Sequence, residues 1–244
     1  MMAAPLLNTS DLDLCMSRQR NRPFFCEGDP TGAVYQVESG CVRLQKLTEG
    51  GRRCIISFCY PGDVFGLGTH GPSQVDAEAA CTSRVSRLGQ AALNRMLQTE
   101  PQRAMQLIDA AYGGQGQVCE HVVMIAFAAA EQKLAWFLFK LGERVGQKAN
   151  GEYLVDLPMM RADIADHLGM TFETVSREMT KLRDLKIIDL LGLRRFKIQR
   201  MAALQSLAFT GTTGITRTPI RPDPLDYLPT TLSAPRQFAS SIAI

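Results

Sequence analysis

Three side chains with complementary hydrogen-bonding chemistry lie at helical spacing in the run TFETVSREMTKL, residues 171–182. Glu173, Ser176 and Arg177 occupy positions i, i+3 and i+4, so a helix would present all three on one face. A guanidinium can donate two hydrogen bonds to guanine O6 and N7, and a carboxylate can accept one from cytosine N4. A carboxylate that faced phosphates would be repelled, so either this helix does not touch DNA or Glu173 contacts something other than phosphate. If the helix binds DNA, the three residues are candidates for reading base edges.

The element that must carry these residues is an amphipathic helix that begins at Thr171, a residue type that caps helix N-termini. Its apolar residues fall on a separate arc and are expected to face the core: Phe172, Val175, Met179 and Leu182. A first helix is predicted over 159–168, and Gly169 after it suits a left-handed C-cap. Two helices joined in this way form a helix-turn-helix, whose second helix enters the major groove.

The charge around this pair of helices is basic. Residues 176–200 contain eight Lys and Arg against three acidic residues, although the whole chain has a net charge of only +3. The segment 187–198, with GLRR at its tip, is typical of a β-hairpin wing able to reach phosphates. A packed helical hairpin with a solvated charged face would give the same pattern, so both interpretations stand at this level.

The rest of the chain divides by its periodicity. Apolar and polar residues alternate over 24–85 between Gly, Pro and Asp turns, which predicts an all-β barrel or sandwich. Helical patterns follow over 90–97, 101–125 and 129–145, and 146–153 is a linker or hairpin tip. After Phe209 the composition turns to Thr, Pro, Gly and Ser without a period, which predicts disorder. The expected domains are a lead (1–19), a β domain (20–98), a long helix (101–127), a helical domain (128–208) and a disordered tail (209–244).

The composition is that of a globular protein, with 244 residues, 45% hydrophobic and 21% charged. The seven Cys form no CxxC pair, and the N-terminus has no signal-peptide pattern. The longest apolar run, 122–130, is far shorter than the roughly 20 residues of a membrane span. We therefore predict a cytoplasmic protein with reduced thiols and no membrane segment. The β domain has no His-x-His pair with a carboxylate, so neither a metal site nor an enzyme activity is predicted.

The run DIADHLGMTFETVSR, with E-x-x-S-R at Glu173, Ser176 and Arg177, resembles the CRP/FNR family of bacterial transcription regulators, in its FNR/FixK branch. The PGD turn, EGDPTGAVYQVESGCVRL and AEQKLAWFLFKL extend the resemblance over about residues 20–208. It implies an α+β fold with an N-terminal cupin-like (cyclic-nucleotide-binding-like) β-roll, a long dimerisation helix and a C-terminal winged helix-turn-helix. It also implies a homodimeric activator that binds a palindrome with TTGAT-type half-sites in an oxygen- or nitrogen-oxide-linked regulon. RNA polymerase would contact the β-roll loop around 66–73, which is shortened here.

By the same resemblance, Glu173, Ser176 and Arg177 would lie at base edges. A second set would contact or support phosphates: Thr171, Thr174, Thr180, Lys181, Arg194 and Arg195. Apolar residues of the long helix give a dimer seam: Leu107, Ala111, Val118, Val122 and Ile125. The stretch YGGQGQ (112–117) interrupts this seam, and each glycine inside a helix destabilises it by roughly 1 kcal/mol. We therefore expect a close-packed but marginal dimer.

The sensing chemistry of other branches is missing from the sequence pattern. No Arg lies between Phe65 and Arg84, so a cyclic phosphodiester would find no cationic fork. Only Cys15 and Cys26 precede the β domain, and they do not supply the four thiolates of an iron–sulfur cluster. We therefore predict no cofactor, with control through expression, thiol oxidation or proteolysis. The alternative is a ligand- or cofactor-gated sensor of the same fold that uses an iron–sulfur cluster, a haem or a redox thiol.

Several single residues have two interpretations. The histidines are candidate haem ligands or, more simply, a loop residue, a helix-surface residue and a phosphate-facing residue: His70, His121 and His167. Four cysteines are expected to be buried on strands as small hydrophobic residues: Cys41, Cys54, Cys59 and Cys81. The tail ends in SSIAI, which is either a protease handle or a dispensable end.

Overall fold

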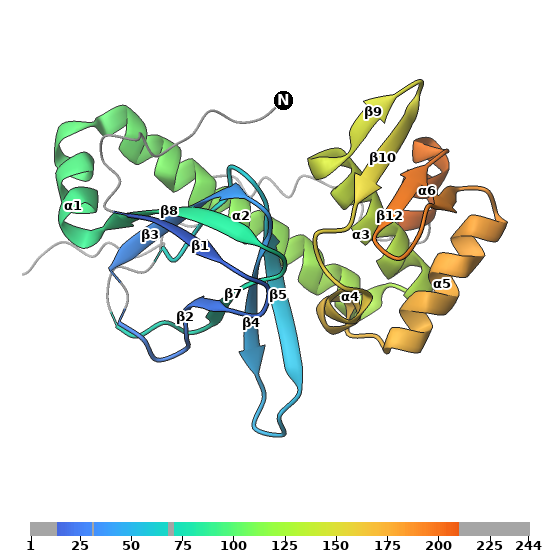
Figure 1. Ribbon diagram of the computed structural model, residues 1–244, viewed down its shortest axis with the longest axis horizontal. Helices are drawn as coiled ribbons and strands as arrows, with labels where there is room; N and C mark the ends of the chain where they lie inside the picture. The colour runs from blue at the N-terminus through green and yellow to red at the C-terminus, as the bar shows by residue number, and fades with distance from the viewer. Residues whose placement is uncertain (1–13, 31, 68–70, 210–244) are drawn as a thin grey trace, which may run out of the picture. The chain divides into compact units, whose positions relative to one another are not determined.

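The computed structural model describes residues 14–30, 32–67 and 71–209 (Figure 1). Its N-terminal part is a β-roll of two four-stranded antiparallel sheets. One sheet has the order β1 (Leu14–Arg18), β8 (Ser83–Gly89), β3 (Ala33–Ser39) and β6 (Val64–Phe65). The other has the order β2 (Pro23–Phe25), β7 (Asp76–Ala79), β4 (Val42–Leu47) and β5 (Arg53–Cys59). The roll therefore begins inside the segment that the sequence assigns to the lead, and it confirms the predicted cupin-like architecture.

The two sheets bury the apolar residues that alternate along their strands. The centre of the roll is formed by Phe24, Val37, Val42, Cys59, Phe65, Ala77, Ala79 and Val85. The turn from β3 to β4 requires a glycine, because Gly40 has a φ of +86° and a Cβ there would lie 2.5 Å from the Thr82 carbonyl oxygen. The alternation of apolar and polar residues in the sequence therefore places the apolar side chains between the two sheets.

Two helices follow the roll. α1 (Gln90–Thr99) continues directly from β8, and α2 (Pro101–Phe127) begins with a proline, which the first helical turn tolerates. Both predicted helices are confirmed, with ends slightly later than expected. One buried cluster joins α1 and α2 to the roll: Val34, Leu88, Leu93, Met96 and Leu107. One face of α2 is therefore held by its own chain.

The C-terminal part is a winged helix-turn-helix. It contains, in chain order, α3 (Ala130–Val145), β9 (Gln147–Ala149), β10 (Glu152–Asp156), α4 (Arg161–Leu168), α5 (Phe172–Asp184), β11 (Ile188–Leu190), β12 (Arg195–Ile198) and α6 (Met201–Phe209). Its sheet has the order β11-β12-β10-β9, so 146–153 is a hairpin tip and the β11–β12 hairpin is the predicted wing. The sheet packs tightly on α3, because a Cβ on Gly142 would lie 2.4 Å from Ile198 Cδ1.

The helix-turn-helix also contacts the roll, where α4 packs against β5. His167 Nδ1 of α4 lies 2.9 Å from the carbonyl oxygen of Ile55. Arg53 of β5 forms ion pairs with Asp163 and Asp166 of α4, at 2.7 and 2.6 Å. The helix α4, which precedes α5, is therefore anchored to β5 of the roll. Within the described ranges, no helix combines the length and the apolar character that a bilayer span requires.

Candidate nucleic-acid interface

The turn between α4 and α5 has the geometry that the sequence predicts. Gly169 adopts a left-handed conformation, with φ +62° and ψ +38°, and ends α4. Thr171 caps α5, because its Oγ1 accepts a hydrogen bond from the backbone N–H of Thr174 at 3.2 Å. Val175, Met179 and Leu182 are fully buried in the core below α5. The face of α5 that carries Glu173 and Arg177 is therefore turned away from the core.

Two of the three predicted base-contacting residues are exposed. Glu173 and Arg177 are both exposed on α5. Hydrogen bonds from its own backbone N–H and from the Thr171 hydroxyl lower the pKa of the Glu173 carboxyl, so this group is a ready acceptor. Ser176 differs, because its Oγ is buried and has no hydrogen-bond partner in the described part of the chain. A base contact from Ser176 therefore requires its side chain to change rotamer.

The predicted phosphate-contacting residues fall into two groups. The three threonines form hydrogen bonds within α5 and its capping turn. The hydroxyls of Thr171 and Thr174 are hydrogen-bonded to each other at 3.0 Å, and Thr180 Oγ1 donates to the Ser176 carbonyl oxygen at 3.1 Å. Lys181 instead pairs with Glu131 of α3, and this hydrogen bond raises the pKa of Lys181.

The arginines of the wing differ from each other. Arg195 pairs with Asp156 through its Nε and Nη2, at 2.5 and 3.1 Å, and this hydrogen bond raises its pKa. Arg194 is exposed beside it, between the strands of the wing. The structure thus brings the predicted cations to the same domain, but Lys181 and Arg195 already have carboxylate partners within the chain.

The environments of two residues of α5 do not follow from the predicted apolar arc. The prediction that Phe172 faces the core is wrong, because Phe172 is 50% exposed at the first residue of α5. Glu178 is buried, with an exposed fraction of 8%. The spacing contained this signal, because Glu178 lies at i+3 from Val175 and therefore shares the buried stripe.

The two described histidines form a buried stack. Their ring centroids are 3.7 Å apart, and His121 Nε2 lies 2.7 Å from the carbonyl oxygen of His167. Burial lowers the pKa of both, that of His167 to about 3. The expectations of a helix-surface His121 and a phosphate-facing His167 are therefore wrong, because both pack between α2, α4 and β5. His70 lies outside the described residues.

The rings do not form part of a metal-ligand cluster. In the described ranges, no group of three His, Cys, Asp or Glu side chains is arranged to hold a metal ion. Cys41 and Cys59 are buried as predicted, and burial raises the pKa of both thiols, which makes them unreactive. The same prediction is wrong for Cys54, which is exposed on β5.

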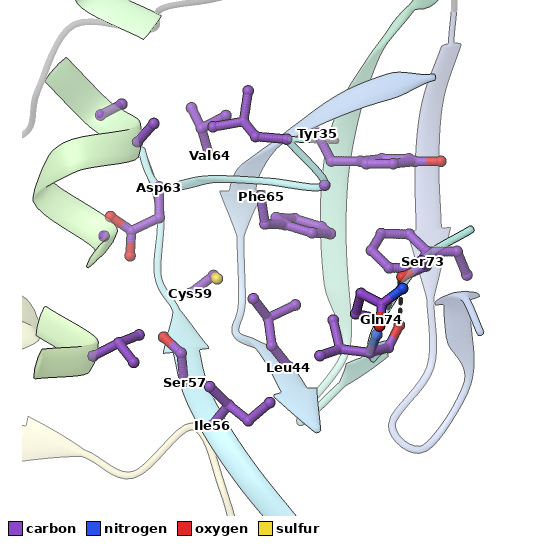
Figure 2. A pocket seen from close by; sticks show the side chains of 18 of the residues that line it. Tyr35, Leu44, Ile56, Ser57, Cys59, Asp63, Val64, Phe65, Ser73 and Gln74 are labelled. Carbon is purple, nitrogen blue, oxygen red and sulfur yellow. Dashed lines mark hydrogen bonds between the residues drawn. The ribbon is translucent and has the colours of Figure 1, made fainter. Parts of the chain in front are cut away.

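A cavity of about 710 Å³ lies between the β-roll and α2 (Figure 2). Phe25, Tyr35 and Phe65 form an aromatic wall, with the rings of Tyr35 and Phe65 stacked at 5.3 Å. The described lining residues include no Lys, Arg or His, and the carboxylate of Asp63 is paired with Arg144. The described part of the lining therefore offers no cation to a cyclic phosphodiester.

The predicted dimer seam is only partly accessible. Leu107 is buried within its own chain, and Val118 lines the cavity. Ala111 and Val122 are exposed, whereas Ile125 is half-buried beside Gly169. A different stripe is exposed at alternating spacings of three and four residues: Met105, Ile108, Tyr112, Gln115, Cys119 and Val122.

These features define a class of protein, in which a cyclic-nucleotide-binding type of β-roll is joined by a long helix to a winged helix-turn-helix. Residues 16–100 match the cyclic nucleotide-binding domain, and residues 132–207 match the Crp-like helix-turn-helix domain. The chain is 36% identical to the nitrogen fixation regulation protein FixK of Rhizobium meliloti over 186 residues, 76% of this chain and 83% of FixK. It therefore belongs to the CRP/FNR family of transcription regulators and is a FixK-like DNA-binding regulator, not an enzyme.

Two further similarities agree with this membership. The transcriptional activatory protein AadR of Rhodopseudomonas palustris is 33% identical over 182 residues, 74% of this chain and 76% of AadR. The structure of FixK2 from Bradyrhizobium japonicum superposes with a TM-score of 0.74 and 31% identity. That match covers 80% of this chain and 96% of FixK2.

Proposed function

We propose that this regulator binds a palindrome with TTGAT-type half-sites as a homodimer and activates transcription in an oxygen- or nitrogen-oxide-linked regulon. The observation that carries the proposal is the exposed face of α5, where Glu173 and Arg177 stand together near the N-terminal end. That end of a recognition helix meets base edges. Arg177 would donate to the half-site guanine, and Glu173 would accept from the cytosine opposite it.

The dimer would form along the exposed stripe of α2. Met105, Ile108, Tyr112 and Val122 are all at least 43% exposed, and apolar residues at a 3.5-residue average spacing are the signature of a two-helix seam. Gly113, Gly114 and Gly116 leave open space, since a Cβ on any of them meets nothing within 4 Å. Two copies could therefore approach closely here. Such a dimer would present two α5 helices to the two halves of a palindrome.

The names of two relatives support a role in transcription regulation and in activation. FixK of Rhizobium meliloti is named for regulation of nitrogen fixation, and AadR is named an activatory protein. Activation would take place in the cytoplasm through RNA polymerase contacts from the loop around 66–73, of which residues 68–70 lie outside the described residues. Thr171, Thr174, Thr180, Lys181, Arg194 and Arg195 would contact or support phosphates, and Ser176 would join the base contacts after a rotamer change.

A ligand-gated regulator of the same fold is the second candidate, and the cavity beside α2 favours it. The cavity is roomy, and its aromatic wall would suit an uncharged ligand. A ligand there would contact Gly113 and Gly114 of α2 and could thereby change the dimer. If the purified protein binds its palindrome equally well with and without cell extract metabolites, the ungated form is favoured.

The test of the proposed function is the change Arg177→Ala, measured by titration of labelled DNA. The ratio of affinities for the TTGAT palindrome and a scrambled duplex should fall by about tenfold to a hundredfold, while weak salt-sensitive binding remains. Arg183→Ala is the matched control, because Arg183 lies on another face of α5 and pairs with Asp184. An unchanged ratio in Arg177→Ala would contradict the assignment.

A further inference from the structure

The recognition helix carries a buried carboxylate that the proposed contacts do not use. Glu178 is 8% exposed and lies between the exposed Arg177 and the fully buried Met179. A buried carboxylate is strongly destabilising unless a cation or hydrogen-bond donors compensate it. Its Oε1 lies 3.5 Å from Arg177 Nε, whereas its Oε2 has no hydrogen-bond partner in the described part of the chain. Arg177 is therefore the cation that faces this carboxylate.

The nearby lysine does not take this role. Lys181 is one turn further along α5, and its charge interacts with Glu178. Its ammonium group, however, forms its hydrogen bond and ion pair with Glu131 of α3. The two carboxylates are thus divided between the two cations, with Glu131 on Lys181 and Glu178 on Arg177.

We propose that Glu178 is a positioning residue that holds the Nε side of Arg177 and thereby directs its two terminal nitrogens toward the half-site guanine. The proposal rests on the proposed function, in which Arg177 reads that guanine. The contact at Nε leaves both terminal nitrogens available, and these form the fork that matches guanine O6 and N7. Burial fixes the carboxylate, so the anchor itself does not move with the exposed side chain.

The consequence of this anchor is specificity. The Arg177 side chain is 69% exposed, and a free arginine of this kind samples many rotamers, some of which reach phosphates instead of bases. Phosphate contacts strengthen binding to every sequence equally, whereas the guanine contact strengthens binding only to the correct site. Glu178 therefore raises the preference for the palindrome and weakens binding to other DNA, since it also removes positive charge from the surface.

The experiment compares Glu178→Gln with Glu131→Gln, which removes the carboxylate paired with Lys181 and leaves Arg177 untouched. Affinities are measured for the TTGAT palindrome and for a duplex in which both half-site guanines are replaced, at one salt concentration. Glu178→Gln should reduce the ratio of the two affinities by about threefold to tenfold, the range for losing one preordered long side chain. Glu131→Gln should change both affinities by the same factor.

The same variants are then made in the Arg177→Ala background, where no guanidinium remains to be positioned. Glu178→Gln should leave the ratio of affinities unchanged there. The inference is overturned if Glu178→Gln keeps the wild-type ratio, or if it lowers the ratio equally with and without Arg177. The proposed function is tested separately. It is contradicted if the wild-type protein shows no preference for the palindrome, or if Arg177→Ala keeps that preference. In either case the inference about Glu178 is contradicted as well.

A readout without DNA guards against a purely structural effect. The Nε–H proton of Arg177, observed by NMR in the full chain, should exchange with solvent more slowly in the wild type than in Glu178→Gln. Glu178→Asp keeps the charge but has a shorter side chain, so its Arg177 Nε–H should exchange as fast as in Glu178→Gln. This variant replaces Glu178→Gln in the experiment if Glu178→Gln does not fold. Equal exchange rates in the wild type and both variants would also overturn the inference.

Discussion

Arg43 of β4 and Asp163 of α4 form a buried ion pair, with Nη1 and Oδ1 3.1 Å apart and with 4% and 3% of their side chains exposed. Asp163 also receives Arg53 of β5 at 2.7 Å, and its second oxygen accepts the backbone N–H of Met160 at 3.0 Å. One carboxylate therefore caps α4 and binds two strands of the β-roll. This side chain therefore holds α4 on the roll together with the Arg53–Asp166 ion pair and the contact of His167 with Ile55.

We predict that Asp163→Asn lowers the free energy of unfolding by about 3 kcal/mol, because it removes the charge that compensates buried Arg43. Glu78 lies 2.5 Å from Arg43 Nη2 and retains part of that compensation. The control is Asp166→Asn, since the Asp166 side chain is 33% exposed and its ion pair is screened by solvent, which limits the loss to about 1 kcal/mol. Urea unfolding measures both, and equal losses would contradict the prediction.

The stacked histidines predict a dependence of stability on pH. The pKa of His167 in the folded protein is about 3, below the ordinary 6.5, so the unfolded chain binds protons more readily. The stabilising contribution is complete above pH 6.5 and is lost progressively between that value and about 3. Lowering the pH from 7.5 to 5.5 should reduce the free energy of unfolding by on the order of 1 kcal/mol for this residue.

The control for the pH effect is His167→Gln. This change removes the titrating ring, so the difference in unfolding free energy between pH 7.5 and 5.5 should become smaller, even though the variant is less stable at both. If the difference stays the same, other groups cause the pH dependence and the role of His167 is refuted.

We predict that Ile108→Glu separates the proposed dimer. A carboxylate in the exposed stripe of α2 would face its own copy across the seam, and two like charges at close range repel. Sedimentation should show a shift toward monomer, and affinity for the palindrome should fall by at least about tenfold, because one half-site is lost. Gln106→Glu adds the same charge to an exposed position of α2 away from the stripe, and it should leave both measurements unchanged.

Two glycines in helices should respond to alanine in opposite directions. In the Ile108→Glu background, where the proposed dimer is separated, Gly114→Ala should raise the free energy of unfolding by about 1 kcal/mol. Within the chain the added methyl group meets nothing within 4 Å, and alanine favours the helix. Gly142→Ala should lower it despite the same helical preference, because the methyl group would overlap Ile198 at 2.4 Å. Thermal unfolding distinguishes the two, and a gain in both variants would show that the α3–sheet contact is looser than described.

The sequence predicts local features of the helix-turn-helix well. Thr171, Gly169 and the buried Val175 follow from capping chemistry and helical spacing, which depend on neighbouring residues only. The dimer seam was harder, because an apolar stripe such as the one with Leu107 looks the same whether it packs on α1 or on a second chain. Phe172 lies on the same apolar arc but is the first residue of α5. It is half exposed although Val175, three residues later, is buried, so the arc alone does not show where the core ends.

The contacts between the roll and α4 could not be predicted from the sequence. Arg43 and Asp163 are 120 positions apart, and no periodicity relates a strand residue to a helix residue at that distance. The buried histidine stack has the same origin, because His121 and His167 meet only once α2 and α4 are packed. In each case the partner is chosen by tertiary structure, and the amino-acid type alone indicates a solvated residue.

If Lys181 and Arg195 contact phosphates as proposed, their internal ion pairs with Glu131 and Asp156 affect the thermodynamics of DNA association. Affinity for a duplex depends on salt because phosphate-bound cations of the solvent are released when protein cations replace them. When a lysine or arginine moves from its carboxylate partner to a phosphate, the carboxylate becomes hydrated and is screened by cations from solution. Some of the ions released from the duplex are then taken up by the protein. The salt dependence of binding is therefore shallower than the number of basic residues on this surface would indicate.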